Sequence, residues 1–169
     1  MTAATRVYIA AGSNVEPQRH LALAAQQLRL AFGDVRFSPA YRNTAVGFEG
    51  PDFINFAATF ETPLPVEQVV AELQRIETLC GRERDAPKWA PRSMDLDILM
   101  YGALVCDRPR LTLPRPDLLR RPYMLGPMAE LAPEAVHPTL GVTMAQLWRE
   151  FDRDAHPMTR VALDGVAQS

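Results

Sequence analysis

The chain has 169 residues, of which 47% are hydrophobic and 22% charged, with a net charge of -2 and a pI near 5.9. This size suits one folded domain spanning 1–169, and the slightly acidic balance excludes whole-chain attraction to nucleic acid. No apolar run reaches the roughly 18 residues of a membrane helix, and residues 1–11 are too short a stretch for a signal peptide. Cys80 and Cys106 lack zinc-site spacing, so we expect a cytoplasmic protein with reduced thiols.

The chain begins with a strand and a helix. Residues 6–11 have the composition of a β-strand, which ends at the turn Gly12-Ser13-Asn14. Apolar residues then recur at helical spacing from Leu21 to Phe32, and Pro17 suits the first helical turn. Gly33 follows the last periodic residue, where glycine commonly ends a helix.

Two further strands and a second helix follow. Residues 35–41 predict a strand, and 43–52, with two glycines and a proline, predict a loop. Residues 53–62 are rich in aromatic and β-branched residues and predict a third strand. A proline then opens a helix with an apolar stripe over 66–80, closed by Gly81.

The remaining elements are shorter. A polar loop at 81–91 precedes a fourth strand, and a turn then leads to a short strand. The predicted elements from there are a strand at 94–101, a strand at 104–106, a proline-rich surface stretch at 109–122, and helices at 124–131 and 143–151. The order strand, helix, strand, strand, helix, strand is that of the ferredoxin-like split βαβ pattern. We therefore predict an α+β sandwich with a mainly antiparallel sheet, its helices on one face, and C-terminal additions.

Two aspartates on the fourth strand give the clearest chemical signal. Asp95 and Asp97 are two residues apart, so their side chains share one face, about 6–7 Å apart at Cα. Leu96, Ile98 and Met100 should point to the opposite, buried face. Neighbouring carboxylates repel each other unless a cation lies between them, and oxygen ligands suit Mg²⁺ bound together with nucleotide phosphates. An edge strand with two solvated aspartates is the alternative.

Basic residues flank this strand on both sides. They are Arg82, Arg84, Lys88 and Arg92 before it, and Arg108, Arg110, Arg115, Arg120 and Arg121 after it. A carboxylate-bound metal surrounded by guanidinium groups can bind a polyphosphate and neutralise the charge of phosphoryl transfer. The chain has no glycine-rich phosphate loop, so such an enzyme must use side chains and metal. A solvated cationic surface, diluted by Glu83, Asp85 and Asp117, is the alternative.

The run from Lys88 to Leu99 resembles the signature of the 6-hydroxymethyl-7,8-dihydropterin pyrophosphokinase family. Further segments are similar to that family in the same order: 8–14, 41–47, 51–55, 82–84, 127–133 and His137-Pro138. The resemblance implies transfer of a pyrophosphoryl group from ATP to the hydroxymethyl oxygen of the pterin, with release of AMP. This reaction is a step of folate biosynthesis.

The resemblance also implies a role for each matching residue. Asp95 and Asp97 would ligate two Mg²⁺ ions, and Arg82 and Arg92 would stabilise charge at the β-phosphate. The nucleotide site would be lined by Gln74, Glu77, Arg84, Lys88, Trp89, Ile98, Arg110, Thr112, Arg115 and Arg121. The pterin site would be formed by Gly12, Asn43, Thr44, Ala45, Val46, Phe53, Asn55 and Tyr123, with the two aromatic rings stacking on the pterin.

Four of these residues can also be judged without the resemblance. Phe53 and Tyr123 could equally be core residues, whereas Asn55 starts an otherwise apolar strand, where a buried amide needs partners. Glu77 follows Leu73 by four residues on the apolar stripe, so its carboxylate needs a bonding partner unless it reaches the helix edge.

The chain departs from the family pattern at a few positions. Arg115 and Pro116 stand where the family often has His and then Tyr or Pro, and arginine is the stronger phosphate donor. Asp85 stands where some members carry a base. Ala45 replaces a common proline, which makes its loop more flexible.

We expect in-line attack on the β-phosphorus without a strong general base, Asp97 or metal-bound water being the only local candidates. The loops at 43–52 and 81–91 should close over the substrates. Two other functions stay open: a nucleotidyltransferase acting on another acceptor, and an RNA-binding module. The acidic charge argues against the second, so we expect no nucleic-acid partner. We also expect a monomer without membrane partners.

Overall fold

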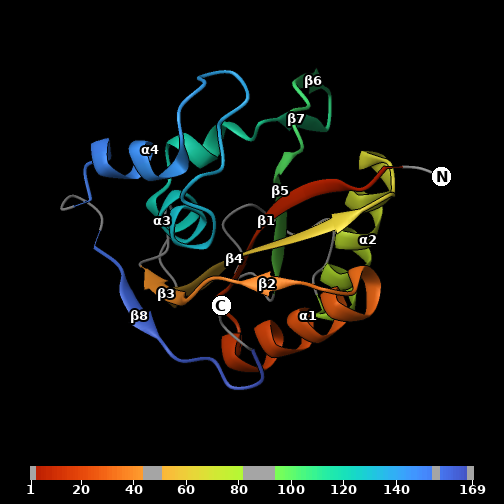
Figure 1. Cartoon of the computed structure of the whole chain (residues 1–169). Coiled ribbons are helices and arrows are strands. Elements are labelled where there is room, and N and C mark those ends of the chain that lie inside the picture. The colour runs from red at the N-terminus through yellow and green to blue at the C-terminus, as the bar shows by residue number, and fades with distance from the viewer. Residues whose placement is uncertain (1–2, 44–50, 82–93, 154–156, 167–169) are drawn as a thin grey trace.

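Figure 1 shows the computed structural model, which describes residues 3–43, 51–81, 94–153 and 157–166. In chain order the elements are β1 (Thr5–Ser13), α1 (Pro17–Phe32), β2 (Arg36–Phe37), β3 (Ala40–Asn43), β4 (Phe53–Thr62), α2 (Val66–Leu79), β5 (Asp95–Tyr101), β6 (Cys106–Arg108), β7 (Leu111–Leu113), the 3-10 helix η1 (Pro116–Leu119), α3 (Pro122–Leu131), α4 (Met144–Glu150) and β8 (Thr159–Val161). No helix in these ranges is both long and apolar enough to cross a bilayer.

The main sheet has the strand order β5-β1-β4-β3-β8, and β2 also pairs with β4. Every pairing in it is antiparallel. The helices α1 and α2 each connect two strands that have a third strand inserted between them, which is the split βαβ arrangement. The predicted α+β ferredoxin-like fold is therefore confirmed.

One face of the sheet packs against α1 and α2. Alternate β1 residues, including Val7 and Ile9, meet Phe56 and Phe60 of β4 in a buried core. The predicted apolar stripes of α1 and α2 form the other half of this core. Proline at the start of α1 and Gly33 after it, with φ 83°, mark the predicted helix ends.

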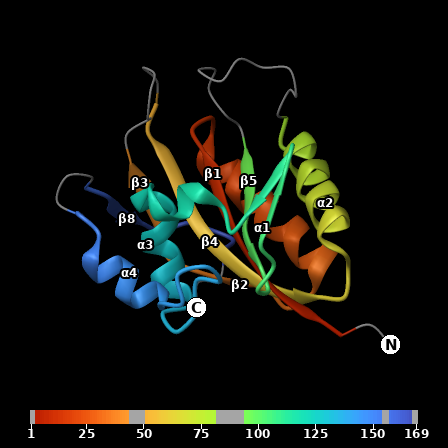
Figure 2. The same ribbon diagram turned by 90° about the horizontal axis from the view of Figure 1, so that it is seen from above.

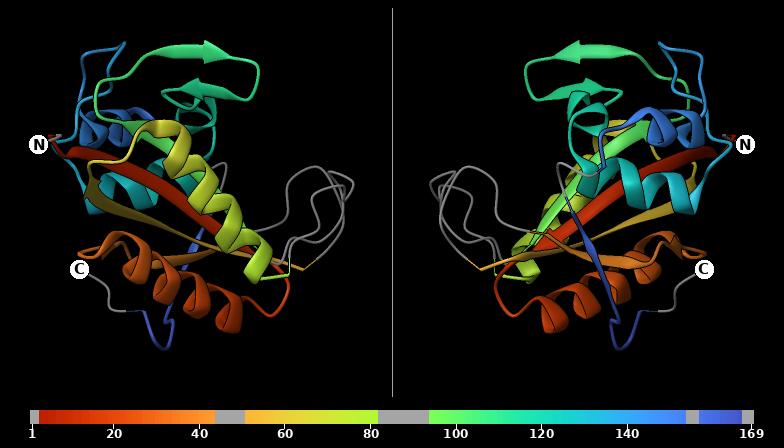
Figure 3. Two further views of the ribbon diagram at one scale, coloured as in Figure 1. Left: turned by 90° about the vertical axis from the view of Figure 1, so that its right-hand side faces the viewer. Right: turned by 90° about the vertical axis from the view of Figure 1, so that its left-hand side faces the viewer.

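The opposite face packs against α3, and α4 packs on α3, as Figure 2 shows. Figure 3 gives two further views of the same arrangement. Ala10, Leu99 and Met100 of the sheet meet Leu125 and Met128 of α3 there. The prediction of helices on only one face is therefore wrong. Leu99 and Met100 both lie in this second core because the β1–β5 register shifts between Tyr8 and Ile9. That shift also places Met100 on the face opposite to the one predicted.

Three other differences involve short elements. The predicted strand 35–41 is divided into β2 and β3 at Pro39, which has no N–H to donate to a ladder. The predicted strand at 104–106 is a β6–β7 hairpin that stands away from the main sheet (Figures 1 and 3). The stretch 109–122 does not run only over the surface, since Leu113 and Leu118 are fully buried.

β8 was not predicted from the sequence. Its three residues are exposed or half-buried and have no apolar alternation. It pairs with β3 and covers an edge of the sheet that would otherwise present unpaired backbone groups.

Candidate active site

A row of directly paired residues crosses the face of the sheet on which α3 lies. Gly12 of β1 is opposite Asn55 of β4 on one side and opposite Asp95 of β5 on the other. Asp97 is opposite Ala10, which lies in the α3 core. Residues paired across antiparallel strands share a face. The predicted pterin-recognising amide and the two predicted metal ligands therefore lie on one surface.

The two carboxylates are half-buried at the start of β5. Asp95 and Asp97 alternate with the buried Leu96 and Ile98, as the strand period predicts. The Leu96 N–H, between them, donates to Glu77 Oε2 at 2.8 Å. This hydrogen bond gives the Glu77 carboxylate, on the apolar stripe of α2, the bonding partner that it needs. Glu77 holds the outer edge of β5 just where the strand bears the aspartates.

Arg115 lies beside the carboxylates. Its Nη1 is 3.6 Å from Asp97 Oδ1, and its Nη2 is 3.4 Å from Asp117 Oδ2. Its backbone N–H donates to the Leu99 carbonyl at 2.9 Å, which ties the segment before η1 to β5. The predicted nucleotide residue Arg115 is thus held next to the predicted metal ligand Asp97. Sequence reasoning gave Asp117 no role beyond diluting charge, although its position two residues after Arg115 was a signal for this pairing.

The other end of the row brings two amide side chains and an aromatic ring close to Gly12. Asn55 Nδ2 donates to Asn43 Oδ1, and Asn43 is paired with Phe53 across β3 and β4. A Cβ on Gly12 would lie 2.5 Å from Asn55 Oδ1 and 3.8 Å from Phe53 Cδ1. Gly12 is therefore required by the close approach of Asn55. The Phe53 side chain is only half-buried, so it is not an ordinary core residue.

Tyr123 brings α3 into the same region. It is half-buried, and burial raises the pKa of its phenol. Arg121 opposes that rise, whereas the nearby carboxylates of Asp117, Asp97 and Asp95 increase the pKa further. The ring therefore stays neutral near pH 7 and lies within electrostatic reach of both aspartates. The structure brings Tyr123 and the aspartates together from separate elements.

The other predicted nucleotide residues are less concentrated. Gln74 lies half-buried on α2, and Arg110 and Thr112 lie exposed on the β6–β7 hairpin, where Thr112 Oγ1 donates to Asp107. The Ile98 side chain is buried in the α1–α2 core, so a nucleotide contact would need its backbone. Eight predicted residues and both closing loops lie wholly or mainly outside the described residues: Thr44, Ala45, Val46, Arg82, Arg84, Lys88, Trp89 and Arg92, with the loops 43–52 and 81–91.

The donor set is suited to a weakly held hard cation. No group of three or more His, Cys, Asp or Glu side chains that could hold a metal occurs within the described ranges. Two adjacent carboxylates fit Mg²⁺, which takes few protein ligands and fills its octahedron with water and phosphate oxygens. Such an ion would be bound mainly together with a nucleotide.

Comparisons with known proteins agree with this geometry. Residues 8–133, about three quarters of the chain, match the model of the 7,8-dihydro-6-hydroxymethylpterin-pyrophosphokinase (HPPK) family. A 2-amino-4-hydroxy-6-hydroxymethyldihydropteridine pyrophosphokinase of Synechocystis is 40% identical over 117 residues, covering 69% of this chain and 60% of that protein. The protein of the same name from Pseudomonas aeruginosa is 38% identical over 133 residues, covering 76% of this chain and 82% of that protein.

A solved structure shares the fold. The crystal structure of Plasmodium falciparum HPPK-DHPS A437G with STZ-DHP matches with a TM-score of 0.70 at 11% identity, over 88% of this chain and 46% of that chain. The chain thus spans less than two thirds of the length of the Synechocystis relative and of this structure. The family match and the identities establish that the chain belongs to the 7,8-dihydro-6-hydroxymethylpterin-pyrophosphokinase family.

Proposed function

We propose that this chain transfers the pyrophosphoryl group of ATP to the hydroxymethyl oxygen of 6-hydroxymethyl-7,8-dihydropterin, in folate biosynthesis. The observation that supports this most is the single row Asn55, Gly12, Asp95 on one face of the sheet. It places an amide suited to a heterocycle edge two strands away from a carboxylate pair suited to a metal. The family match supports a pterin as the heterocycle and ATP as the polyphosphate.

Asp95 and Asp97 would hold Mg²⁺. Two ions bound there with ATP would supply charge neutralisation at the phosphate oxygens. The role of the chain is to keep the two carboxylates side by side. Arg115, 3.6 Å from Asp97, lowers the repulsion between them and is positioned to donate to a phosphate oxygen.

Arginines would stabilise the charge that develops during transfer. Arg121 lies close enough to Tyr123 to oppose the rise in the pKa of its phenol. We assign it and Arg115 to the nucleotide phosphates. Arg82 and Arg92, which lie outside the described residues, are proposed to stabilise the β-phosphate under attack.

The pterin would lie between Phe53 and Tyr123 with its edge on Asn55. Asn43 accepts a hydrogen bond from Asn55 and so fixes which amide atoms face the ligand. Gly12, which has no Cβ, lets the Asn55 amide approach β1 closely. A flat heterocycle held between two rings gains stacking contacts and loses few degrees of freedom on binding.

The proposed transfer is a displacement at the β-phosphorus of ATP. The pterin hydroxymethyl oxygen forms a bond to the β-phosphorus, and the bond from that phosphorus to the oxygen bridging the α-phosphate breaks. AMP leaves with this oxygen, and the hydroxyl proton passes to solvent. Positioning and charge neutralisation would provide most of the acceleration. We further propose that residues 1–169 form one monomeric, cytoplasmic pyrophosphokinase domain that binds neither nucleic acid nor membrane.

Product analysis tests this proposal. The chain is incubated with ATP, Mg²⁺ and 6-hydroxymethyl-7,8-dihydropterin, and the nucleotides are separated by chromatography. AMP and a pterin diphosphate in equal amounts are expected, with no turnover after chelation of Mg²⁺. Release of pyrophosphate would instead indicate a nucleotidyltransferase, and ADP would indicate transfer of a single phosphoryl group.

A further inference from the structure

The row that forms the site continues beyond it to the edge of the sheet. Asn55 is paired with Tyr41 of β3, and Tyr41 is paired with Arg160 of β8. One line of cross-strand neighbours therefore runs through Arg160, Tyr41, Asn55, Gly12 and Asp95. All five residues share the face on which α3 lies. The first of them is outside residues 8–133, the part of the chain that matches the family model.

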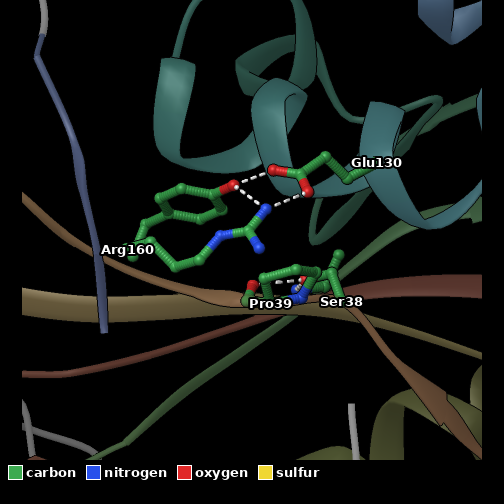
Figure 4. A network of polar contacts seen from close by, with 6 residues as sticks. Ser38, Pro39, Glu130 and Arg160 are labelled. Carbon is green, nitrogen blue, oxygen red and sulfur yellow. Dashed lines mark hydrogen bonds and ion pairs between the residues drawn. The ribbon is translucent and has the colours of Figure 1, made fainter. Parts of the chain in front are cut away.

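A polar network joins this row to α3. The Tyr41 hydroxyl donates to Glu130 Oε1. Arg160 Nη2 lies 2.8 Å from Glu130 Oε2 and 3.3 Å from the Tyr41 hydroxyl oxygen. Figure 4 shows the Arg160 and Glu130 side chains pointing toward each other. Glu130 thus receives one bond on each carboxylate oxygen, from two adjacent strands. We call Tyr41, Glu130 and Arg160 the α3 anchor.

Glu130, one of the three anchor residues, is on the same helix as Tyr123, the proposed stacking residue. Glu130 follows Tyr123 by seven residues, which is two helical turns, so both side chains lie on the same side of α3. At the other end, Tyr41 is two residues from Asn43 on β3 and therefore on the same face. The anchor thus connects the helix that bears Tyr123 to the strand that bears Asn43.

A pocket of about 380 Å³, partly open to solvent, lies beside the anchor, with Tyr41, Glu130, Gly126, Trp148 and Met158 among its lining residues. A Cβ on Gly126 would meet Met158 Cε at 2.9 Å and Trp148 at 3.0 Å, so the C-terminal segment approaches α3 closely at that glycine. Next to this pocket, the polar contacts of the anchor join α3 to the sheet in addition to the apolar contacts of Leu125 and Met128.

We propose that the α3 anchor positions Tyr123 over the pterin site and so sets the affinity for the pterin. This inference rests on the proposed function, since it assumes that the pterin lies between Phe53 and Tyr123. The Arg160 and Glu130 side chains are 63% and 34% exposed, so their ion pair contributes little to folding stability. Its effect is on the geometry of the site. A small effect on stability with a clear effect on pterin binding is therefore the signature of the anchor.

Tyr41→Phe tests the proposal with the least disturbance, because it removes only the hydroxyl. The dissociation constant of 6-hydroxymethyl-7,8-dihydropterin should rise about 3- to 10-fold, the change expected for one lost hydrogen bond. The KM for ATP and kcat at saturating pterin should stay unchanged. Arg160→Ala should give a change in the same direction, and Arg160→Lys, which keeps the charge, a smaller one.

Tyr101→Phe is the matched control. Its hydroxyl donates to the Leu64 carbonyl at 2.6 Å, away from the anchor. This variant should lower Tm and leave pterin affinity as in the wild type. A similar fall in pterin affinity in Tyr101→Phe would show a general loss of stability and overturn the positioning role.

Asn55→Ala distinguishes failure of the anchor from failure of the pterin pocket. If Tyr41→Phe and Arg160→Ala bind the pterin like the wild type while Asn55→Ala does not, the anchor has no positioning role and the pocket stands. If Asn55→Ala also binds the pterin normally, the proposed pocket is wrong, and the anchor falls with it.

Discussion

The two faces of the sheet are built from the same strands and differ in how far their apolar pattern extends. Towards α1 and α2 the pattern is continuous, and the aromatic rings of Phe37 and Phe56 meet edge to face with centroids 5.5 Å apart. Towards α3 it covers only part of the sheet, around Ala10, Leu99 and Met100. The remainder of that face has glycine, amide and carboxylate groups in direct register.

This difference shows how a small sandwich can separate stability from chemistry. The apolar core between the sheet and the helices α1 and α2 is the larger of the two, so it provides most of the apolar burial on folding. The other face carries polar groups beside its smaller apolar core, at some cost from repulsion between the carboxylates. Substitutions on the α1–α2 face should therefore change folding stability, and substitutions on the α3 face should change turnover or substrate affinity.

The largest effect is expected at the carboxylates. Asp97→Ala should reduce kcat by about 1,000-fold or more, because one ligand and its charge are lost at the metal. The midpoint of urea unfolding should stay equal or rise, since repulsion with Asp95 is relieved. Asp34→Ala, at an exposed position after α1, is the control and should leave turnover intact. Normal turnover in Asp97→Ala would remove the metal site from β5.

The reverse effect is expected in the α1–α2 core. Phe56→Ala should lower the free energy of unfolding by about 3–5 kcal/mol, because a fully buried ring leaves a cavity. The kcat per folded molecule should be that of the wild type, measured in the temperature range where the variant is folded. A large loss of kcat in folded protein would show that the two faces are coupled.

Gly12→Ala should act on the pterin alone. Its new Cβ would lie 2.5 Å from Asn55 Oδ1, a distance that forces the amide to move. We expect pterin affinity to fall at least about 10-fold, with the KM for ATP unchanged, in a binding titration. Gly33→Ala is the matched control: its φ of 83° strains an alanine, but nothing lies within 4 Å. It should lose stability and keep pterin affinity.

Glu77 links the two faces, so its substitution should affect both quantities moderately. Glu77→Ala leaves the Leu96 N–H without the acceptor it has at 2.8 Å, which should cost about 1–3 kcal/mol in unfolding free energy. Turnover should fall as well, since this contact lies between the two aspartates. Glu77→Gln, which retains an acceptor oxygen, should recover most of the stability. If Glu77→Ala unfolds like the wild type, the contact does not hold β5.

The smallest effect is a pH dependence away from both faces. His137 is buried, and burial lowers the pKa of its imidazole below the usual 6.5. Its Nδ1 accepts from the Thr139 and Leu140 N–H groups at 3.3 Å, which favours the neutral ring. Because the folded state takes up this proton only at lower pH, stability should fall as pH drops through the region near 6.5. Thermal unfolding at pH 7 and pH 5 should show a smaller drop for His137→Asn, which keeps an acceptor.

Much of the fold could be predicted because its periodicities are local. The boundaries of α1, α2 and β4 follow from proline, glycine and apolar spacing, and the sheet order follows from the element order. The second helical face could not be predicted so easily. Leu99 and Met100 reach it only because the β1–β5 register shifts, and a shift depends on the partner strand.

The site likewise has residues that local spacing reveals and contacts that only the tertiary structure reveals. Asp95 and Asp97 could be found because residues two apart share a face. Their alignment with Gly12 and Asn55 depends on pairing between distant strands, which spacing alone does not give. The contacts of Glu77 with Leu96, of Arg115 with Asp117, and of Arg160 with Glu130 depend on tertiary packing in the same way.

The most direct test of the site is a crystal structure with a non-hydrolysable ATP analogue, Mg²⁺ and 6-hydroxymethyl-7,8-dihydropterin. We predict metal density between Asp95 and Asp97, and the pterin ring between Phe53 and Tyr123 with its edge on Asn55. Metal bound away from β5, or a pterin on another surface of the sheet, would contradict this assignment.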